Sequence, residues 1–219
     1  KNNDKENLIS IKSEISSRIV LSLHYPKTGG TSLRSSLKEI YGMHFLQYYP
    51  EAKVQGTELS DFFRNYKCIH GHLSLDCYAK FFEDLQLITW LRDPVDRTIS
   101  LYNHILSNPD SSNEFHQRVY RDKPSILEFC EMPENQNQLF YWIGDRNPED
   151  FKFIGFLETA QSSIVKCTSA LGWSRVPKLP WSNKTPKRNQ LQVSPSEREF
   201  IKSKNQDEWL WIEKAKELF

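Results

Sequence analysis

The sequence has few cysteines, no long apolar run and no large excess of charge of either sign, and each shortage removes a class of protein. Its four cysteines include no pair at CxxC spacing, which argues against a zinc site. No apolar stretch approaches the roughly 20 residues of a membrane-spanning helix, and no signal-peptide core is visible. A formal net charge of +1 gives no overall attraction to nucleic acid, so an anion site has to be local.

The composition is that of a folded globular chain. Of the 219 residues, 38% are hydrophobic, 13% aromatic and 26% charged, which is enough apolar material for one sizeable core. We expect residues 1–17 to be a polar N-terminal tail and residues 18–219 to form a single domain. A chain of this length does not need disulfides, so free and partly buried thiols are the first expectation, with one disulfide left open.

The stretch 18–41 combines a strand, a glycine turn and a helix. Residues 19–23 are an apolar run with β-branched members, and apolar residues recur at helical spacing over 33–41. Between them lies the motif Pro26-Lys27-Thr28-Gly29-Gly30-Thr31-Ser32. A helix N-terminus offers unpaired backbone N–H groups, glycines let the backbone approach an anion closely, and the lysine adds a full positive charge. The motif therefore predicts a phosphate-binding loop, in which Thr31 or Ser32 caps the helix or gives a hydroxyl to the ligand.

This turn also has an ordinary alternative, because Gly-Gly turns precede many helices that bind nothing. The Walker pattern of ATP-binding loops requires Gly, four residues and then Gly-Lys-Ser/Thr. Here Lys27 precedes both glycines, which disfavours an ordinary ATP site.

Two further strand ends carry side chains that suit an anionic ligand. Residues 86–91 predict a buried strand that runs directly into Arg92, and a shorter strand over 67–70 runs into a His-Gly-His sequence containing His72. In parallel α/β sheets, ligands bind at the carboxyl ends of the strands. We therefore expect Lys27, His72 and Arg92 to lie on one edge of a sheet.

The rest of the chain alternates between strand and helix patterns. Additional strands are expected at 45–48 and 151–156, and helices at 58–66, 75–84, 93–106, 125–130, 135–143, 158–171, 194–204 and 207–219. Loops are expected at 108–123 and in the Pro-rich, basic segment 173–190. This alternation predicts an α/β fold of three layers, P-loop-like, with a mainly parallel central sheet flanked by helices.

Three motifs in this order resemble those of the sulfotransferases that use 3′-phosphoadenosine-5′-phosphosulfate (PAPS). They are the Pro-Lys-Thr-Gly-Gly-Thr-Ser loop, the His-Gly-His sequence, and Arg-Asp-Pro-Val-Asp-Arg-Thr-Ile-Ser-Leu-Tyr over 92–102. The likeness is greatest to the carbohydrate branch that includes heparan sulfate 2-O-sulfotransferases. It spans residues 18–105, with weaker similarity at 153–159 and 183–188, and it implies that 18–219 is a single sulfotransferase domain.

The resemblance implies roles for particular residues. The 5′-phosphosulfate loop corresponds to Lys27, Thr28, Gly29, Gly30, Thr31 and Ser32. The 3′-phosphate site corresponds to Arg92 and Ser100, and a guanidinium with a hydroxyl suits a phosphate well. In the late basic loop, Lys184 and Arg188 would lie in a flap over the nucleotide. Arg97 either assists the site or forms a surface salt bridge with Asp93 or Asp96.

The reaction that the resemblance implies is in-line transfer of a sulfuryl group from PAPS to a hydroxyl or amine, leaving 3′-phosphoadenosine-5′-phosphate (PAP). No metal is expected. Lys27 would contact the bridging oxygen of the leaving group, and His72 would be the general base, since histidine titrates in the useful range. His70 is expected to be structural, while His24 and His104 are expected to be packing or surface residues.

The acceptor is expected to be a hydroxyl-bearing carbohydrate or small molecule, with specificity set by 43–57, 108–123 and 132–148. Four aromatic residues are expected to pack rather than bind sugar: Trp90, Tyr102, Tyr141 and Trp142. Two other functions stay open, a P-loop kinase or other nucleotide phosphotransferase and an inactive nucleotide-binding module. The oligomeric state is not predicted. The compartment is cytoplasmic if the chain is complete, and the Golgi lumen if it is part of an anchored enzyme.

Overall fold

A parallel five-stranded sheet forms the centre of the protein, whose computed structural model describes residues 18–49, 63, 65–79, 84–180 and 191–219. The strands are β1 (Ile19–Leu23), β2 (Phe45–Gln47), β3 (Cys68–Gly71), β4 (Leu85–Leu91) and β5 (Phe153–Phe156). Their order is β2-β3-β1-β4-β5, and every neighbouring pair is parallel. This places β1 between β3 and β4, so that Ser22 pairs with His70 on one side and with Ile88 on the other.

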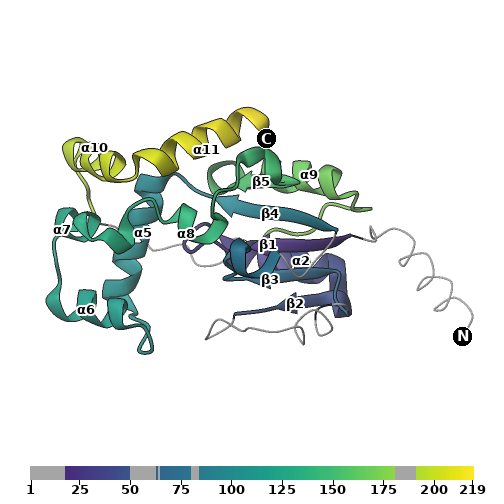
Figure 1. Ribbon diagram of the computed structural model, residues 1–219, viewed down its shortest axis with the longest axis horizontal. Coiled ribbons are helices and arrows are strands. Elements are labelled where there is room, and N and C mark those ends of the chain that lie inside the picture. The colour runs from purple at the N-terminus through teal and green to yellow at the C-terminus, as the bar shows by residue number, and fades with distance from the viewer. Residues whose placement is uncertain (1–17, 50–62, 64, 80–83, 181–190) are drawn as a thin grey trace, which may run out of the picture.

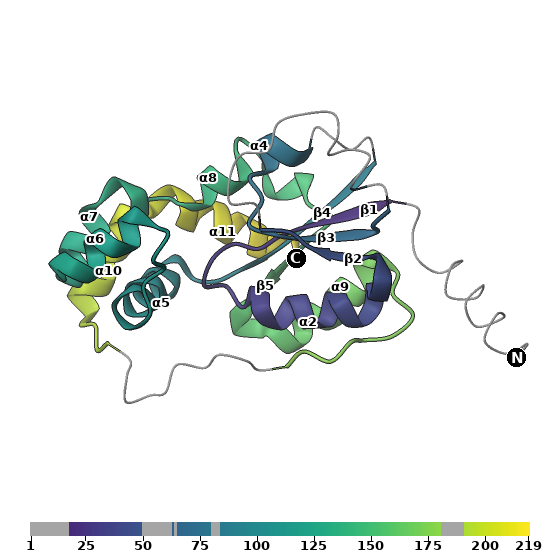
Figure 2. The same cartoon turned by 90° about the horizontal axis from the view of Figure 1, so that it is seen from below.

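Helices cover both faces of the sheet, as the two ribbon views show (Figures 1 and 2). One face is covered by α2 (Gly30–Tyr41) and α9 (Ala160–Leu171), and the other by α4 (Leu75–Tyr78), α8 (Leu139–Ile143) and α11 (Gln206–Leu218). Because both faces are covered, the strands are near-continuous apolar runs rather than alternating ones. The predicted three-layer α/β fold is confirmed.

The core therefore has two halves, one on each side of the sheet. Leu21, Leu23 and Leu87 pack with Ile212 of α11 on one side. On the other side, Val20, Ile88 and Trp90 pack with α2 and α9. These side chains alternate along the strands, which fixes the register of the sheet because a slip of one residue would reverse both sets.

A third apolar cluster lies beyond the carboxyl ends of the strands, at the left of Figure 1. It joins α5 (Pro94–Ser107), α6 (Glu114–Asp122), α7 (Ile126–Glu131) and α10 (Pro195–Lys204).

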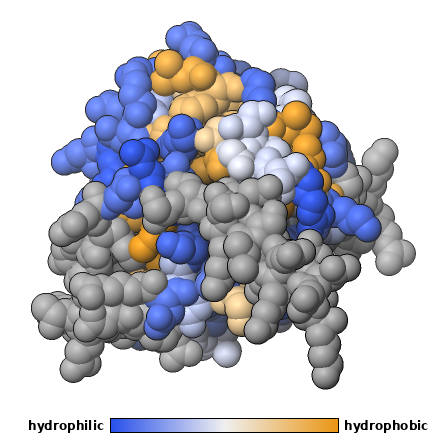
Figure 3. All heavy atoms as spheres, turned by 90° about the vertical axis from the view of Figure 1, so that its right-hand side faces the viewer, coloured by the Kyte–Doolittle hydropathy of each residue, from blue (hydrophilic) through white to orange (hydrophobic). Residues whose placement is uncertain are grey.

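Short 3-10 turns connect the elements at Gly42–His44, Pro133–Asn135, Pro148–Asp150 and Leu157–Thr159. On the opposite face, at the amino ends of the strands, hydrophilic residues border small groups of hydrophobic ones (Figure 3). The carboxyl ends of the strands therefore face the helical cluster formed by α5, α6, α7 and α10.

Capping residues mark the starts of two helices. The Asp93 side chain accepts a hydrogen bond from the Asp96 N–H at the start of α5, with Pro94 in the first turn, and Asn108 ends the helix. Ser194 and Glu197 form a capping box at the start of α10. Signals of this kind involve only neighbouring residues, which is why they can be predicted from sequence.

Three predictions about helices are wrong. The segment 108–123 is not a loop, because Asn113 caps α6 and the fully buried Val119 anchors it against α5 and α7. The helix expected from 135 begins only at Leu139, since Asn137 has a positive φ of 48°. The C-terminal helix exposes 49% of Leu218, which was expected to pack, while Trp211 is buried.

Several expectations concern residues outside the described ranges. These are the tail at 1–17, the helix at 58–66, most of the second half of the helix at 75–84, and the late-loop residues Lys184 and Arg188. Cys68, Cys130 and Cys167 are buried free thiols. Within the described parts of the chain, none of the helices combines the length and apolar character needed to cross a membrane.

Candidate active site

A cavity of about 1490 Å³ opens at the carboxyl ends of the strands. Its wall brings together Lys27 from the loop after β1, His72 from the end of β3, Arg92 from the end of β4, and Ser100 from the second turn of α5. The expectation that the three strand ends share one edge is therefore confirmed. The physical reason is the strand order, because β1 is hydrogen-bonded to both β3 and β4 and all three run in one direction.

The loop between β1 and α2 has the geometry of an anion-binding turn. Gly29 has a φ of +87° and is the N-cap of α2, and no side chain caps this helix end. Lys27 also has a positive φ, 69°, which is uncommon for a residue with a Cβ. Because Gly29 occupies the capping position, the expectation that Thr31 or Ser32 caps the helix is wrong. Both residues line the cavity instead.

The Thr28 side chain has a different position from the rest of the loop. It is buried, and its hydroxyl donates a hydrogen bond of 2.7 Å to the carbonyl oxygen of Tyr25. This hydrogen bond stabilises the turn, and the Thr28 side chain does not form part of the cavity wall.

Positive charge is concentrated beside this loop. Burial, and then the charge of nearby Arg92, lower the pKa of Lys27 below its ordinary value. Two cations that are brought together in this way favour an anion between them, because its charge relieves their repulsion. Lys27 and Arg92 are the two positively charged residues beside the loop, and both line the same cavity.

Three imidazoles lie together at the ends of β1 and β3. The ring centroid of His24 is 4.6 Å from that of His72 and 5.1 Å from that of His70, to which it is nearly parallel. His70 is fully buried and its Nδ1 lies 2.9 Å from the Ser22 hydroxyl, in agreement with the structural role expected for it. His72 borders the cavity, where Trp142 lies 5.7 Å from it between ring centroids.

The three histidines are neutral at ordinary pH for the same physical reason. Burial, then the neighbouring imidazoles, lower the pKa of His24 to about 2. Burial, then His72 and Arg34, lower the pKa of His70 to about 3, and burial lowers the pKa of His72 to about 4. The change is smallest for His72, because its ring is exposed to water on the cavity side.

Some residues of the cavity wall were not expected there. His24 and His104 both line it, although neither was given a role. The position of His24 could have indicated this, because it directly follows β1 at the sheet edge where a ligand was predicted to bind. Tyr141 and Trp142 also line the cavity; the expectation of packing is wrong for Tyr141, which is 67% exposed, and holds for Trp142 and the buried Trp90.

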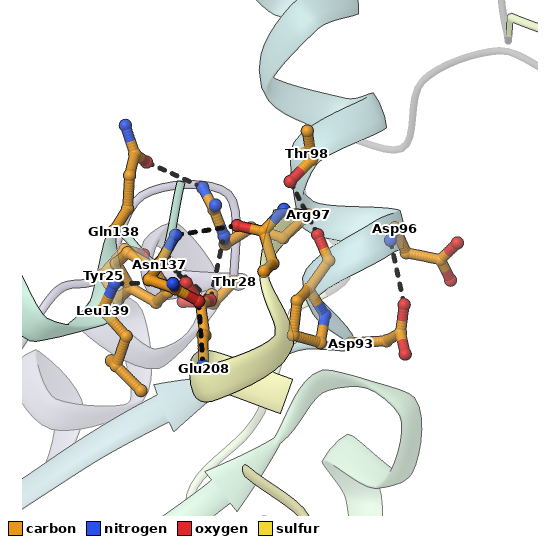
Figure 4. A network of polar contacts seen from close by, with 12 residues as sticks. Tyr25, Thr28, Asp93, Asp96, Arg97, Thr98, Asn137, Gln138, Leu139 and Glu208 are labelled. Carbon is orange, nitrogen blue, oxygen red and sulfur yellow. Dashed lines mark hydrogen bonds and ion pairs between the residues drawn. The ribbon is translucent and has the colours of Figure 1, made fainter. Parts of the chain in front are cut away.

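A buried polar network holds Tyr25, the residue directly before the loop 26–32 (Figure 4). The Tyr25 hydroxyl donates to both carboxylate oxygens of Glu208, at 2.9 and 3.1 Å. The guanidinium of Arg97 lies over the Tyr25 ring at 4.8 Å and donates to Gln138 at 2.9 Å. Arg97 is fully buried, so both expectations for it, assistance at the site and a surface salt bridge, are wrong.

The expected late-loop contacts, Lys184 and Arg188, lie outside the described residues. Directly after them, Leu191, Gln192 and Val193 line the cavity. In the described parts of the chain, no group of three or more His, Cys, Asp or Glu side chains is arranged to hold a metal ion.

Comparison with known proteins adds little to this picture. No family model and no curated protein matches the sequence. Among solved structures, mouse sulfotransferase SULT7A1, crystallised in complex with PAP, is similar over 93% of this chain and 68% of its own, with 17% identity and a TM-score of 0.46. Similarity at this level carries no weight for function, so the functional argument depends on the residues of the cavity.

Proposed function

We propose that this protein is a sulfotransferase that transfers a sulfuryl group from PAPS to a hydroxyl acceptor, with a carbohydrate as the preferred acceptor class. The observation that carries the proposal is the meeting of Lys27, His72, Arg92 and Ser100 in one cavity, at the uncapped N-terminus of α2. These residues come from the three motifs that resemble sulfotransferase motifs, and they lie far apart in the sequence.

The cavity suits a ligand with anionic groups at two ends. The helix N-terminus and Lys27 would hold the 5′ end, because backbone N–H groups and an ammonium together favour a negatively charged group. Arg92 and Ser100 would hold the 3′-phosphate through charge-assisted hydrogen bonds. Gly29, with a φ of +87°, permits the sharp turn that brings the N-terminus of α2 to the cavity.

Two residues would carry the chemistry. PAPS supplies the activated sulfuryl group, whose bond to the 5′-phosphate oxygen breaks as a bond to the acceptor oxygen forms. His72 would take the acceptor proton on a ring nitrogen, because its pKa keeps it unprotonated at neutral pH. Lys27 would stabilise the charge that develops on the bridging oxygen, in the way that fixed cations stabilise developing charge in other group transfers.

Calorimetric titration with PAP and with ATP separates this proposal from a nucleotide phosphotransferase. We expect PAP to bind without dependence on Mg²⁺, and more tightly than ATP. Preference for ATP with Mg²⁺ would contradict the sulfotransferase assignment.

A transfer assay with radiolabelled PAPS then separates an enzyme from an inactive binding module. Glycans and small alcohols are the test acceptors. We expect labelled product with the wild type, and none with His72→Ala although PAP affinity remains close to that of the wild type. Transfer by His72→Ala would place the base elsewhere, and PAP binding with no transfer to any acceptor would favour the binding module.

A further inference from the structure

His24 occupies a position at the phosphate-binding turn that its sequence neighbours do not explain. Its ring lies directly over Gly30, so that a Cβ on this glycine would come within 1.9 Å of the His24 Cδ2 and 2.0 Å of its Nε2. The ring edge nearest the first residue of α2 is therefore the edge that carries Nε2. The same ring lines the cavity.

The other ring nitrogen of His24 is held by a neighbour. Its Nδ1 lies 2.8 Å from the Tyr49 hydroxyl. The Arg34 guanidinium, through its charge and a hydrogen bond, opposes the rise in pKa that burial causes at Tyr49. Because arginine only donates, Arg34 favours the arrangement in which the Tyr49 oxygen accepts and its O–H is directed to Nδ1 of His24, and we assign this O–H as the donor.

This arrangement decides where the proton of the neutral imidazole lies. A ring that accepts at Nδ1 carries its proton at Nε2. Within the described residues, Nε2 of His24 has no hydrogen-bond partner. Its N–H therefore lies beside Gly30, the first residue of α2, whose N-terminus no side chain caps.

We propose that His24 is a binding residue for the anionic group held by the loop 26–32, and that its Nε2–H donates a hydrogen bond to this group in a tautomer fixed by Tyr49. The inference rests on the proposed function, in which that group is the 5′ end of the nucleotide. It also explains why glycine stands at position 30, since any side chain there would take the space of the imidazole.

The test compares two nucleotides that differ only at the 5′ end. In calorimetric titrations, His24→Phe keeps a ring over Gly30 but removes the donor, so PAP should bind about tenfold or more weakly, the usual effect of losing a hydrogen bond to a charged group. Adenosine 3′-phosphate, which lacks the 5′ group, should bind to both proteins equally. Tyr49→Phe should weaken PAP binding less than His24→Phe does. It removes the hydroxyl that fixes the tautomer of His24, but it leaves the His24 imidazole in place.

Nitrogen NMR of the wild-type protein gives a readout that does not depend on a variant folding. The His24 side chain should show its proton on Nε2, and this signal should shift when PAP is added. Equal PAP affinity in the wild type and His24→Phe, an equal loss for both nucleotides, or a proton on Nδ1 would each overturn the inference. A wild type that binds no PAP would overturn the proposed function and this inference with it.

Discussion

Arg97 and Glu208 form an ion pair in the interior of the protein, with Nε 3.4 Å from Oε1 and both side chains completely buried. Arg97 belongs to α5 and Glu208 to α11, so the pair connects the helical cluster to the helix that covers the sheet. Glu208 also accepts hydrogen bonds from the Tyr25 hydroxyl and the Leu139 N–H. The two charges thus share one network with Tyr25, the residue directly before the loop 26–32.

Removal of one member of this pair should strongly destabilise the fold. Glu208→Ala leaves the Arg97 charge buried without its partner, which typically costs about 3–5 kcal/mol in the free energy of unfolding. Urea denaturation measures this change. The matched control is Glu149→Ala, which breaks the exposed pair with Lys214 and should have little effect on stability. Equal effects of the two substitutions would contradict a structural role for the buried pair.

Arg92→Ala should weaken the binding of nucleotides that carry a 3′-phosphate. We expect PAP affinity to fall about 10- to 100-fold, because a charge-assisted hydrogen bond is lost. The affinity for adenosine 5′-phosphate, which has no 3′-phosphate, should fall much less. Calorimetry with both nucleotides tests this, and Arg121→Ala, which alters an exposed arginine paired with Asp122, is the control. A loss that is equal for both nucleotides would place Arg92 at another part of the ligand.

Transfer activity should persist well below neutral pH. The general base has to be unprotonated, and burial lowers the pKa of His72 to about 4. Therefore kcat/KM should be nearly constant from pH 8 to about pH 5 and should fall about tenfold per pH unit below the pKa. Circular dichroism at each pH separates this loss from unfolding. A fall that begins near 6.5, the ordinary value for histidine, would contradict the lowered pKa of His72.

Acidification should also lower the stability of the fold. The native pKa values of His24 and His70 are about 2 and 3, below the unfolded value near 6.5, so the unfolded state binds more protons once the pH falls below that value. Stability is therefore complete above pH 6.5 and decreases from there toward pH 3. Thermal unfolding should show a lower Tm at pH 5 than at pH 7.

His70→Asn is the variant that tests this pH dependence. It keeps a polar group near Ser22 but removes one imidazole, so the slope of stability against pH should decrease by about 1 kcal/mol per pH unit below 6.5. Urea denaturation at several pH values gives the slope. An unchanged slope would assign the dependence to other groups.

Gly30→Ala should disrupt the anion site through His24. The new Cβ would overlap the imidazole, whose nearest atoms lie at 1.9 and 2.0 Å, so the ring has to move. We expect PAP affinity to fall at least as far as it does in His24→Phe. In the double variant Gly30→Ala/His24→Ala the overlap is relieved, so most of the lost stability should return while PAP binding stays weak. Stability that is no better in the double variant would show that the glycine is required for another reason.

Sequence patterns were sufficient to predict the features of this protein that depend on neighbouring residues. Gly29 in the turn and Asp93 with Pro94 at the start of α5 follow from local backbone chemistry. The apolar strands predicted a covered parallel sheet, and the topology of such sheets gathers strand ends at one edge. This was enough to predict that Lys27, His72 and Arg92 lie together.

The tertiary structure alone decided which side chains are buried and what they contact. Arg97 lies in a helix next to two aspartates, yet its partner is Glu208 in α11, which no local pattern indicates. His24 faces Gly30 and Tyr49 because β1, α2 and the segment after β2 converge there. Burial and partners are set by the packing of elements that are distant in the sequence, whereas capping and periodicity involve only neighbouring residues.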